Sequence, residues 1–490
     1  MREKEILILG GGVAGLSAGI FALKKGYRVT IAEQHNIAGG NLTGWNRNGF
    51  HIDNCIHWLT GTNKNSGLYK MWEELGALGD GIKVVKNEAL YCYEKDGQSL
   101  SLWRSIDKTA KEMLELSPKD ARRIRKFRRS VKNIMFINGI GGKKHNESGN
   151  IFNKMASLAS ILYFNRMSVV EYGEKFHHPL LKEFFSSLMG PDFSMAAFAF
   201  VAATYCGNNG DLPEGGSFAM AEHMIERFKS LGGRLLTRKK ASKINVEDNL
   251  ATSVTFEDGD TIKADRIIVT FDPKMLFGKL LDIKLPRPFK KIYESKAFKR
   301  FSSIHAAFAV DAADVPFKGT LVVDIPEDLQ PVLKAKSCIV REFSHEKKYS
   351  PEGRNIIQTM IYMDEDNSKG LVALAKNRAA YRAKKDQLKA AQLELVERQV
   401  PALKGKLTEL DAWTPASYAR YVGSEIGSFM SFVMPAGKAP VSIGSRVKKV
   451  KNLFLATQWQ TSPGGLPMAA SAGKKAVETI EKTDKKRRNA

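Results

Sequence analysis

The sequence predicts an α/β protein of two domains, and three observations carry this prediction. Residues 5–33 read as strand, glycine-rich turn, helix and strand, which is the order of a parallel βαβ unit. Two later stretches, residues 205–275 and 440–482, read as further strands and helices of the same kind. The chain of 490 residues is too long for a single hydrophobic core, so the intervening segments belong to a second domain.

The turn after the first strand has the glycine spacing of a dinucleotide-binding motif. An apolar strand from Glu5 to Leu9 leads into Gly10, Gly12 and Gly15. Gly10 allows a tight turn, Gly12 has no Cβ to block a pyrophosphate, and Gly15 allows the helix to pack closely on the strand. The turn therefore predicts a Rossmann-like unit that binds a dinucleotide.

The following helix and the acid after the second strand complete this motif. The helix spans about residues 13–25, and its first residues, Val13 and Ala14, direct free amides and the positive end of the helix dipole toward phosphates. The second strand ends at Glu33, whose carboxylate can accept hydrogen bonds from ribose hydroxyls and would repel a 2′-phosphate. The predicted ligand is a dinucleotide without that phosphate.

The first returning stretch starts at residues 211–216, a turn that leads into an amphipathic helix with Met220 and Met224 on its apolar face. A hairpin around residues 257–260 and a buried strand over 264–270 follow. These elements extend the predicted parallel sheet.

The second returning stretch ends the sheet. A buried strand over residues 452–457 is followed by a turn rich in Pro and Gly at 462–467. The next helix runs from Met468 to about Glu481 and again begins where a ligand could meet free amides.

The intervening segments predict a mixed α+β domain. Strands are expected over residues 303–310 and 355–363, and a helix of some 20 residues begins at Ala379. The apolar run of residues 195–206 is either a core helix or the wall of an apolar tunnel. Tyr205 and Cys206, at its end, are candidates to line a cleft between the domains.

The formal net charge of +24 indicates an anionic partner or a strongly solvated surface. Residues 119–129 are the most basic stretch, and Ile124, Phe127 and Val131 give it an apolar stripe at helical spacing. This helix either packs its stripe in the core or docks on an anionic membrane surface. No nucleic-acid motif accompanies the charge, so nucleic acid is not an expected partner. The basic residues 483–490 are expected to form a disordered tail.

Composition predicts a cytoplasmic protein, with a peripheral membrane location as the extension of the docking alternative. The four cysteines are scattered without a CxxC pair, which predicts neither a disulfide framework nor a metal site. The first strand begins at the N-terminus, which leaves no room for a signal peptide, and no apolar run has the ~20 residues of a membrane span.

Five motifs together resemble those of one flavoprotein family. They are Glu33 with Gly39-Gly40, the signature Gly49-Phe50-His51-Ile52-Asp53, the turn Pro213-Glu214-Gly215-Gly216, Thr414-Pro415 with Tyr421, Gly423 and Gly427, and Pro463-Gly464-Gly465-Leu466-Pro467. On these motifs the chain resembles the phytoene desaturases, carotenoid isomerases and retinol saturases of the flavin amine-oxidase superfamily, over nearly its whole length.

The resemblance implies FAD as the cofactor and a discontinuous, Rossmann-like FAD-binding domain of the GR2 type. That domain would comprise residues 1–85, 205–275 and 440–482, and a mixed α+β substrate domain would comprise residues 86–204 and 276–439. The implied cofactor-binding residues are Gly10, Gly12, Val13, Ala14, Gly15, Glu33, Gly39, Gly40, Asn41, Ala241, Thr457, Gly464, Gly465 and Leu466.

The resemblance further implies hydride transfer between flavin N5 and a C–H bond of a lipophilic substrate. The reaction would be desaturation, saturation or double-bond isomerisation of a polyene, retinoid or fatty-acyl chain. His57, His51 and Asp53 are the candidates for moving a proton, with a structural role as the alternative for each.

Two other functions stay open. They are a flavin amine or porphyrinogen oxidase, and a flavin- or lipid-binding protein without catalysis. Since only one βαβ motif is present, the electron partner is a quinone, oxygen or a nicotinamide bound without its own domain.

Overall fold

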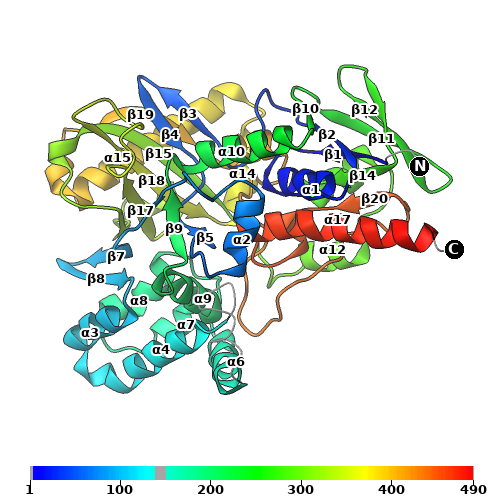
Figure 1. Cartoon of the computed structure of the whole chain (residues 1–490). Helices are drawn as coiled ribbons and strands as arrows, with labels where there is room; N and C mark the ends of the chain where they lie inside the picture. The colour runs from blue at the N-terminus through cyan, green and yellow to red at the C-terminus, as the bar shows by residue number, and fades with distance from the viewer. Residues whose placement is uncertain (1–3, 138–150, 489–490) are drawn as a thin grey trace.

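A five-stranded parallel sheet unites three distant stretches of the chain, in the order β10-β2-β1-β14-β20 (Figure 1). The computed structural model describes residues 4–137 and 151–488. The strands of this sheet are β1 (Glu5–Leu9), β2 (Arg28–Ala32), β10 (Arg234–Leu236), β14 (Arg266–Val269) and β20 (Leu453–Leu455). The predicted Rossmann-like α/β fold is thereby confirmed, whereas the domain boundaries stay a prediction.

Alternate residues of β1 face two different cores. Ile6 and Ile8 pack with the helices α1 (Val13–Leu23), α10 (Gly216–Ser230) and α17 (Leu466–Arg488), which lie along one face of the sheet (Figure 1). Leu7 and Leu9 pack on the opposite side. The elements there are β11 (Ala241–Glu247), β12 (Leu250–Phe256), β13 (Thr261–Lys263), the short helix η2 (Leu276–Leu280) and α12 (Arg287–Tyr293). This alternation is the period of two that a strand buried on both faces requires.

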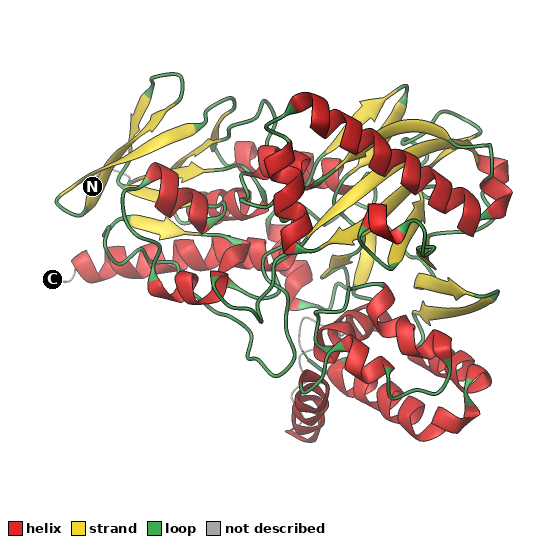
Figure 2. Ribbon diagram, turned by 180° about the vertical axis from the view of Figure 1, so that it is seen from behind, coloured by secondary structure: helices red, strands yellow, loops and turns green. Residues whose placement is uncertain are grey.

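A second sheet of seven strands has the order β19-β15-β18-β17-β16-β7-β8 and is antiparallel except between β16 and β7. Its strands are β7 (Ala89–Lys95), β8 (Gln98–Trp103), β15 (Ser302–Asp311), β16 (Thr320–Asp324), β17 (Ser337–Glu342), β18 (Arg354–Met363) and β19 (Thr408–Trp413). One face packs against α15 (Arg378–Gln399), with α13 (Gln330–Leu333) and α14 (Glu365–Leu374) nearby (Figure 2).

Short elements join the two sheets. They are β3 (Gly44–Arg47), β4 (Phe50–Asp53), β5 (Leu59–Thr60), α2 (Gly67–Glu74), β6 (Val84–Val85), β9 (Gly210–Pro213) and α16 (Pro415–Val422). The strand β9 pairs with both β5 and β6, which brings the turn after Pro213 next to Asp53.

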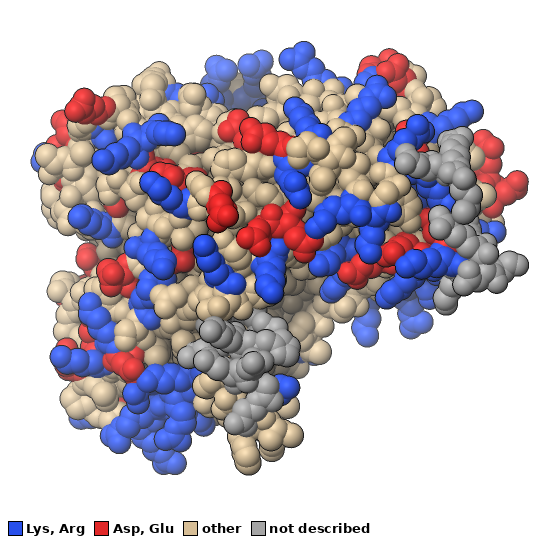
Figure 3. All heavy atoms as spheres, in the orientation of Figure 1, with Lys and Arg blue, Asp and Glu red and all other residues tan. Residues whose placement is uncertain are grey.

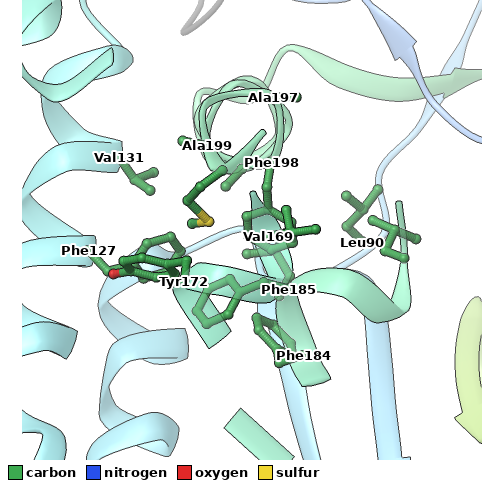
Figure 4. Packing of buried hydrophobic residues seen from close by; sticks show 14 of the residues in the cluster. Leu90, Phe127, Val131, Val169, Tyr172, Phe184, Phe185, Ala197, Phe198 and Ala199 are labelled. Atoms are coloured by element: carbon green, nitrogen blue, oxygen red, sulfur yellow. The ribbon is translucent and has the colours of Figure 1, made fainter. Parts of the chain in front are cut away.

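A layer of helices lies below the sheets in Figure 1. It comprises α3 (Ile106–Leu116), α4 (Ala121–Ile134), α6 (Ile151–Asn165), α7 (Val169–Gly173), α8 (Pro179–Ser187) and α9 (Met195–Cys206). Its core is a cluster of aromatic rings, among them Phe127, Tyr172, Phe185 and Phe198 (Figure 4). Tyr172 and Phe185 meet edge to face with their ring centroids 4.9 Å apart.

The apolar stripe of the basic stretch is core, as one of the two interpretations expected. Ile124, Phe127 and Val131 of α4 are fully buried, while Lys and Arg side chains gather at the lower end of the molecule, where α4 lies (Figure 3). Docking of that face on a membrane stays a prediction. Within the described ranges, no helix is long and apolar enough to cross a membrane.

The expectation of a disordered tail over residues 483–490 is wrong for residues 483–488, because α17 continues to Arg488. Asp484 is buried and forms ion pairs with Arg266 and with Lys4, and it accepts a hydrogen bond from Tyr27 Oη at 3.0 Å. Arg266 is also buried, so its charge needs this carboxylate and the helix end is held against the sheet.

Candidate functional site

One continuous cavity of about 690 Å³ runs from the carboxyl ends of the parallel strands to the space between the second sheet and α9. The residues that follow β1, β2, β14 and β20 all line it, as the crevice rule for open α/β sheets requires. The cavity therefore has a nucleotide end, at these strands, and an apolar end, at the helical layer.

The glycine turn forms the floor of the nucleotide end. Gly10, Gly12, Val13 and Ala14 line the cavity, and Gly10 has a φ of +99°. No described side chain caps α1, and its first turn contains no acidic residue, so its amides are free to meet a phosphate.

Gly15 has a different task from the other glycines of the motif. It does not line the cavity, and a Cβ at Gly15 would lie 2.0 Å from the carbonyl oxygen of Gly10. A Cβ at Gly12 would meet only ordinary contacts, the nearest being Gly40 Cα at 3.7 Å. Gly15 thus serves the packing of helix on strand, and Gly12 leaves space in the cavity.

Glu33 is held in place by backbone amides. Its carboxylate accepts hydrogen bonds from Gly11 N at 2.7 Å and from His35 N at 2.9 Å. The Glu33 side chain is 5% exposed and lines the cavity, so its remaining lone pairs can accept hydrogen bonds from the hydroxyl groups of a ribose.

Three buried polar atoms in the cavity wall have no partner among the described residues, namely the hydroxyl oxygen of Ser428 and two oxygens of an amide and a carboxyl group. Asn41 Oδ1 is the amide oxygen, although Asn41 Nδ2 donates to Phe429 O at 3.0 Å. Asp272 Oδ2 is the carboxyl oxygen, and burial raises the pKa of this carboxyl above its usual range. Unpaired buried acceptors are costly, so these two oxygens fit a ligand that offers hydroxyl donors, as the ribityl and ribose groups of a flavin dinucleotide do.

The C-terminal turn approaches the cavity between its two ends. Thr457, Gly464, Gly465 and Leu466 line it. Gln458 fixes the turn, since its Oε1 accepts a hydrogen bond from Gly465 N at 2.8 Å and its Nε2 donates to Phe429 O at 3.2 Å. Backbone without bulky side chains thus faces the cavity where a flat ring could lie against it.

The apolar end is built from the second sheet and the helical layer. Its wall includes Leu90, Phe193, Ala197, Phe301, Ile339 and Met360. The described Lys, Arg, Asp and Glu residues that line the cavity are Glu33, Lys239, Lys240 and Asp272. All four lie at the nucleotide end, since Lys239 N donates to Glu33 O at 2.8 Å and Asp272 follows β14 beside the glycine turn.

The run of residues 195–206 is both a core helix and a cavity wall. Met195, Ala199 and Cys206 of α9 are buried in the core, while Ala197 and Val201 face the cavity. Tyr205 and Cys206 do not line it. Tyr205 Oη instead donates to Asn87 O at 2.5 Å.

Of the three predicted proton carriers, only His57 lines the cavity. Burial lowers the pKa of His57 well below its usual value, and the charge of Arg341 lowers it further. The imidazole is therefore neutral at neutral pH.

Asp53 and His51 lie outside the cavity. Asp53 accepts hydrogen bonds from Ser217 N at 2.6 Å, Ser217 Oγ at 2.7 Å and Tyr349 Oη at 3.0 Å. His51 contacts Asn46 Oδ1 through Nδ1 at 2.9 Å, and burial lowers its pKa. This placement favours a structural role for both.

The other predicted cofactor residues, Gly39, Gly40 and Ala241, also line the cavity. Sequence reasoning did not identify Lys239, Lys240, Phe271 and Asp272. A signal for Phe271 and Asp272 was available, because they follow a strand predicted to be parallel to the first one.

Comparisons with known proteins agree with this geometry. The model of the flavin containing amine oxidoreductase family matches residues 13–480. The chain is 22% identical over 465 residues to prolycopene isomerase 1, chloroplastic, of an Oncidium hybrid cultivar, which covers 87% of this chain and 75% of that protein. It is 24% identical over 322 residues to 1-hydroxycarotenoid 3,4-desaturase of Flavobacterium sp. (strain P99-3). That alignment covers 62% of this chain and 64% of the desaturase.

Solved structures show the same fold. An oxidoreductase from Methanosarcina mazei is similar with a TM-score of 0.63 at 16% identity, over 98% of this chain and 100% of that one. Cyclohexylamine oxidase from Brevibacterium oxydans IH-35A has a TM-score of 0.58 at 13% identity, over 99% and 100%. The family match, the fold and the cavity agree on the cofactor, FAD. The chain belongs to the flavin containing amine oxidoreductase family and is an FAD-dependent oxidoreductase.

Proposed function

We propose that the enzyme acts on C–C bonds of a long lipophilic molecule, a polyene, retinoid or fatty-acyl chain, by desaturation, saturation or double-bond isomerisation. The observation that carries this proposal is the distribution of charge in the cavity. Every lysine and carboxylate of its described wall lies at the nucleotide end, and the apolar end offers aliphatic and aromatic surface. An uncharged hydrocarbon gains most from such a wall.

The apolar end is a poor site for a protonated amine. An ammonium group removed from water needs a carboxylate or an acceptor-rich wall, and no described carboxylate lines that end. Carotenoid-converting relatives support the same choice, since prolycopene isomerase and 1-hydroxycarotenoid 3,4-desaturase are among the similar proteins.

The chain's own residues would bind and orient the substrate and exclude water. Bound FAD supplies the hydride chemistry. Asn41 and Asp272 would hold hydroxyl groups of the cofactor through their unpaired oxygens. His57, neutral because of burial, would offer its unprotonated ring nitrogen to accept a proton or a hydrogen bond beside the substrate.

The electron partner and the location belong to the same proposal. We propose a quinone, oxygen or a nicotinamide as the partner, and a cytoplasmic protein that works at a membrane periphery. The single βαβ motif supports the choice of electron partner, the lipophilic substrate supports the membrane periphery, and the scattered cysteines support the cytoplasm.

Anaerobic mixing of the holoenzyme with defined substrates tests the proposal. Oxidised and reduced enzyme are each mixed with a poly-cis carotenoid, a retinoid and an unsaturated fatty acid, and flavin absorbance and product mass are followed. Bleaching of oxidised flavin indicates desaturation, reoxidation of reduced flavin indicates saturation, and a changed double-bond geometry with no net flavin change indicates isomerisation. Reduction by cyclohexylamine or putrescine, with no response to any polyene, would refute the proposal in favour of an amine oxidase.

A further inference from the structure

The helix α6 exposes most of its large apolar side chains, while two of its three buried residues are serines. Met155, Leu158 and Leu162 recur at helical spacing and are 52–64% exposed. Ser157, Ser160 and Phe164 form the buried side, and Ser157 Oγ donates a hydrogen bond to a carbonyl of α4 at 2.5 Å. An amphipathic helix of a water-soluble surface has the reverse arrangement.

The exposed apolar surface is concentrated on this one helix. Eight large hydrophobic side chains are exposed among the described residues, and five of them belong to α6, from Ile151 to Leu162. Single exposed apolar side chains are common, but a contiguous group indicates contact with another apolar phase.

The neighbouring helix α4 supplies positive charge. It carries seven Lys and Arg residues and no acid, and α6 carries no acid either. Lys and Arg side chains gather at the lower end of the molecule in Figure 3, where α4 lies in Figure 1. Arg123, Arg128 and Lys132 form ion pairs within the fold.

Three further arginines of α4 remain for an external partner. Arg122, Arg125 and Arg129 are exposed, and no carboxylate of the described residues lies within 4.0 Å of their guanidinium groups. Guanidinium groups of this kind suit phosphate oxygens.

We propose that α4 and α6 form a docking surface for an anionic lipid bilayer. The docking surface comprises Met155, Leu158 and Leu162, which enter the acyl region, and Arg122, Arg125 and Arg129, which contact headgroup phosphates. Apolar and basic surfaces side by side match a bilayer interface, whose apolar and anionic layers also lie side by side.

The docking surface lies close to the apolar end of the cavity. The helix α9 packs against α6, and Ala197 and Val201 of α9 line that end. A molecule dissolved in the bilayer would therefore have a short way to the cavity. The proposal rests on the membrane location proposed above and names the surface that achieves it. Because binding to vesicles is measured without turnover, failure of docking and failure of the proposed reaction are distinguishable.

Flotation of the FAD-loaded full chain with vesicles tests the docking surface. Vesicles of phosphatidylcholine alone are compared with vesicles that contain phosphatidylglycerol. We expect binding to the anionic vesicles, weakened at least tenfold by high salt. The triple variant M155S/L158S/L162S and the triple variant R122Q/R125Q/R129Q should each bind at least tenfold more weakly, and the arginine variant should lose most of the salt dependence.

Two matched variants serve as controls. V246S/L250S removes exposed apolar side chains on the β11–β12 hairpin, and K448Q/K449Q/K451Q removes three exposed charges before β20. Both should bind vesicles like the wild type. FAD content and circular dichroism verify that every variant is folded, which is expected since all substituted side chains are exposed.

Other outcomes overturn the proposal. The control variants could weaken vesicle binding as much as the docking-surface variants do. That result would show that binding is a nonspecific effect of the protein's surface. The wild type could instead form a dimer in solution and bind no vesicles. If M155S/L158S/L162S dissociated that dimer, α6 would be a contact between two copies of this chain.

Discussion

At the scale of single residues, the glycines of the first turn separate two requirements of the site. Gly12→Ala adds a methyl group that meets only ordinary protein contacts, at a φ of −73° that alanine tolerates, so the free energy of unfolding of the apoprotein should change by less than about 1 kcal/mol. The same methyl group occupies space in the cavity, so FAD affinity should fall at least about tenfold, or about 1.4 kcal/mol.

Gly15→Ala should affect the stability of the apoprotein more than Gly12→Ala does. Its methyl group would lie 2.0 Å from a backbone oxygen, so the apoprotein itself should lose about 1–3 kcal/mol of stability. Urea unfolding of both apoproteins and FAD titration by fluorescence quenching measure the two quantities. Wild-type FAD affinity in Gly12→Ala would contradict the assignment of Gly12 to the cofactor site.

A buried histidine predicts how stability depends on pH. His305 is 1% exposed, stacks on Trp413 with ring centroids 4.5 Å apart, and has its pKa lowered by burial to about 3. The unfolded chain takes up this proton near pH 6.5, while the folded protein does so only near pH 3. His305 therefore contributes stability above pH 6.5 that is lost, at about 1.4 kcal/mol per pH unit, as the pH falls below 6.5.

His305→Gln should remove this dependence. Urea unfolding at pH 7.5, 6.0 and 5.0 should give a slope of stability against pH that is smaller in the variant by about one proton. The comparison uses slopes, so a general destabilisation of the variant by lost packing does not affect it. Equal slopes would mean that His305 is already charged in the folded protein.

At the scale of elements, the C-terminal helix is the clearest case for measurement. Deletion of residues 483–490 removes Asp484 and leaves the buried Arg266 without a carboxylate, which should cost about 3–5 kcal/mol of stability. Deletion of residues 486–490 keeps this ion pair and should leave the melting temperature unchanged. Asp484→Asn should resemble the longer deletion, and equal melting temperatures for both deletions would contradict the anchoring of the helix.

The sequence predicted elements well where periodicity is strong and poorly where a tertiary contact decides. The first turn, β14 and the helix of residues 378–399 lie where the pattern placed them. The basic end of α17 looked like a solvated tail, because its charge is visible in the sequence and its partner Arg266, more than two hundred residues away, is not.

The candidate site residues show the same difference between positions that a local motif decides and positions that a tertiary contact decides. Gly12, Glu33 and Gly464 were identified by local motifs that the cofactor itself imposes, and all three line the cavity. Asp53 and His51 follow one of those motifs in the sequence, but the fold turns Asp53 toward Ser217 and Tyr349 instead. Spacing along a chain cannot show to which side a residue turns after a short strand.

At the scale of the whole molecule, one cavity connects two layers of the fold that arise from different parts of the chain. The parallel sheet builds the nucleotide end, and the second sheet with α9 builds the apolar end. The two ends should therefore respond independently to substitution, because the residues predicted to bind the cofactor do not build the apolar wall.

Ala197→Trp tests this independence. Ala197 is buried on α9 and lines the apolar end, so an indole there fills part of the space for a long substrate. Binding of long polyenes should weaken at least tenfold, or by about 1.4 kcal/mol. Shorter polyenes should bind as before, and the FAD content should not change. Ala379→Trp, at an exposed position of α15, is the matched control and should affect neither ligand. Fluorescence quenching with polyenes of graded length measures both variants, and a loss of FAD in Ala197→Trp would show that the two ends of the cavity are not separate.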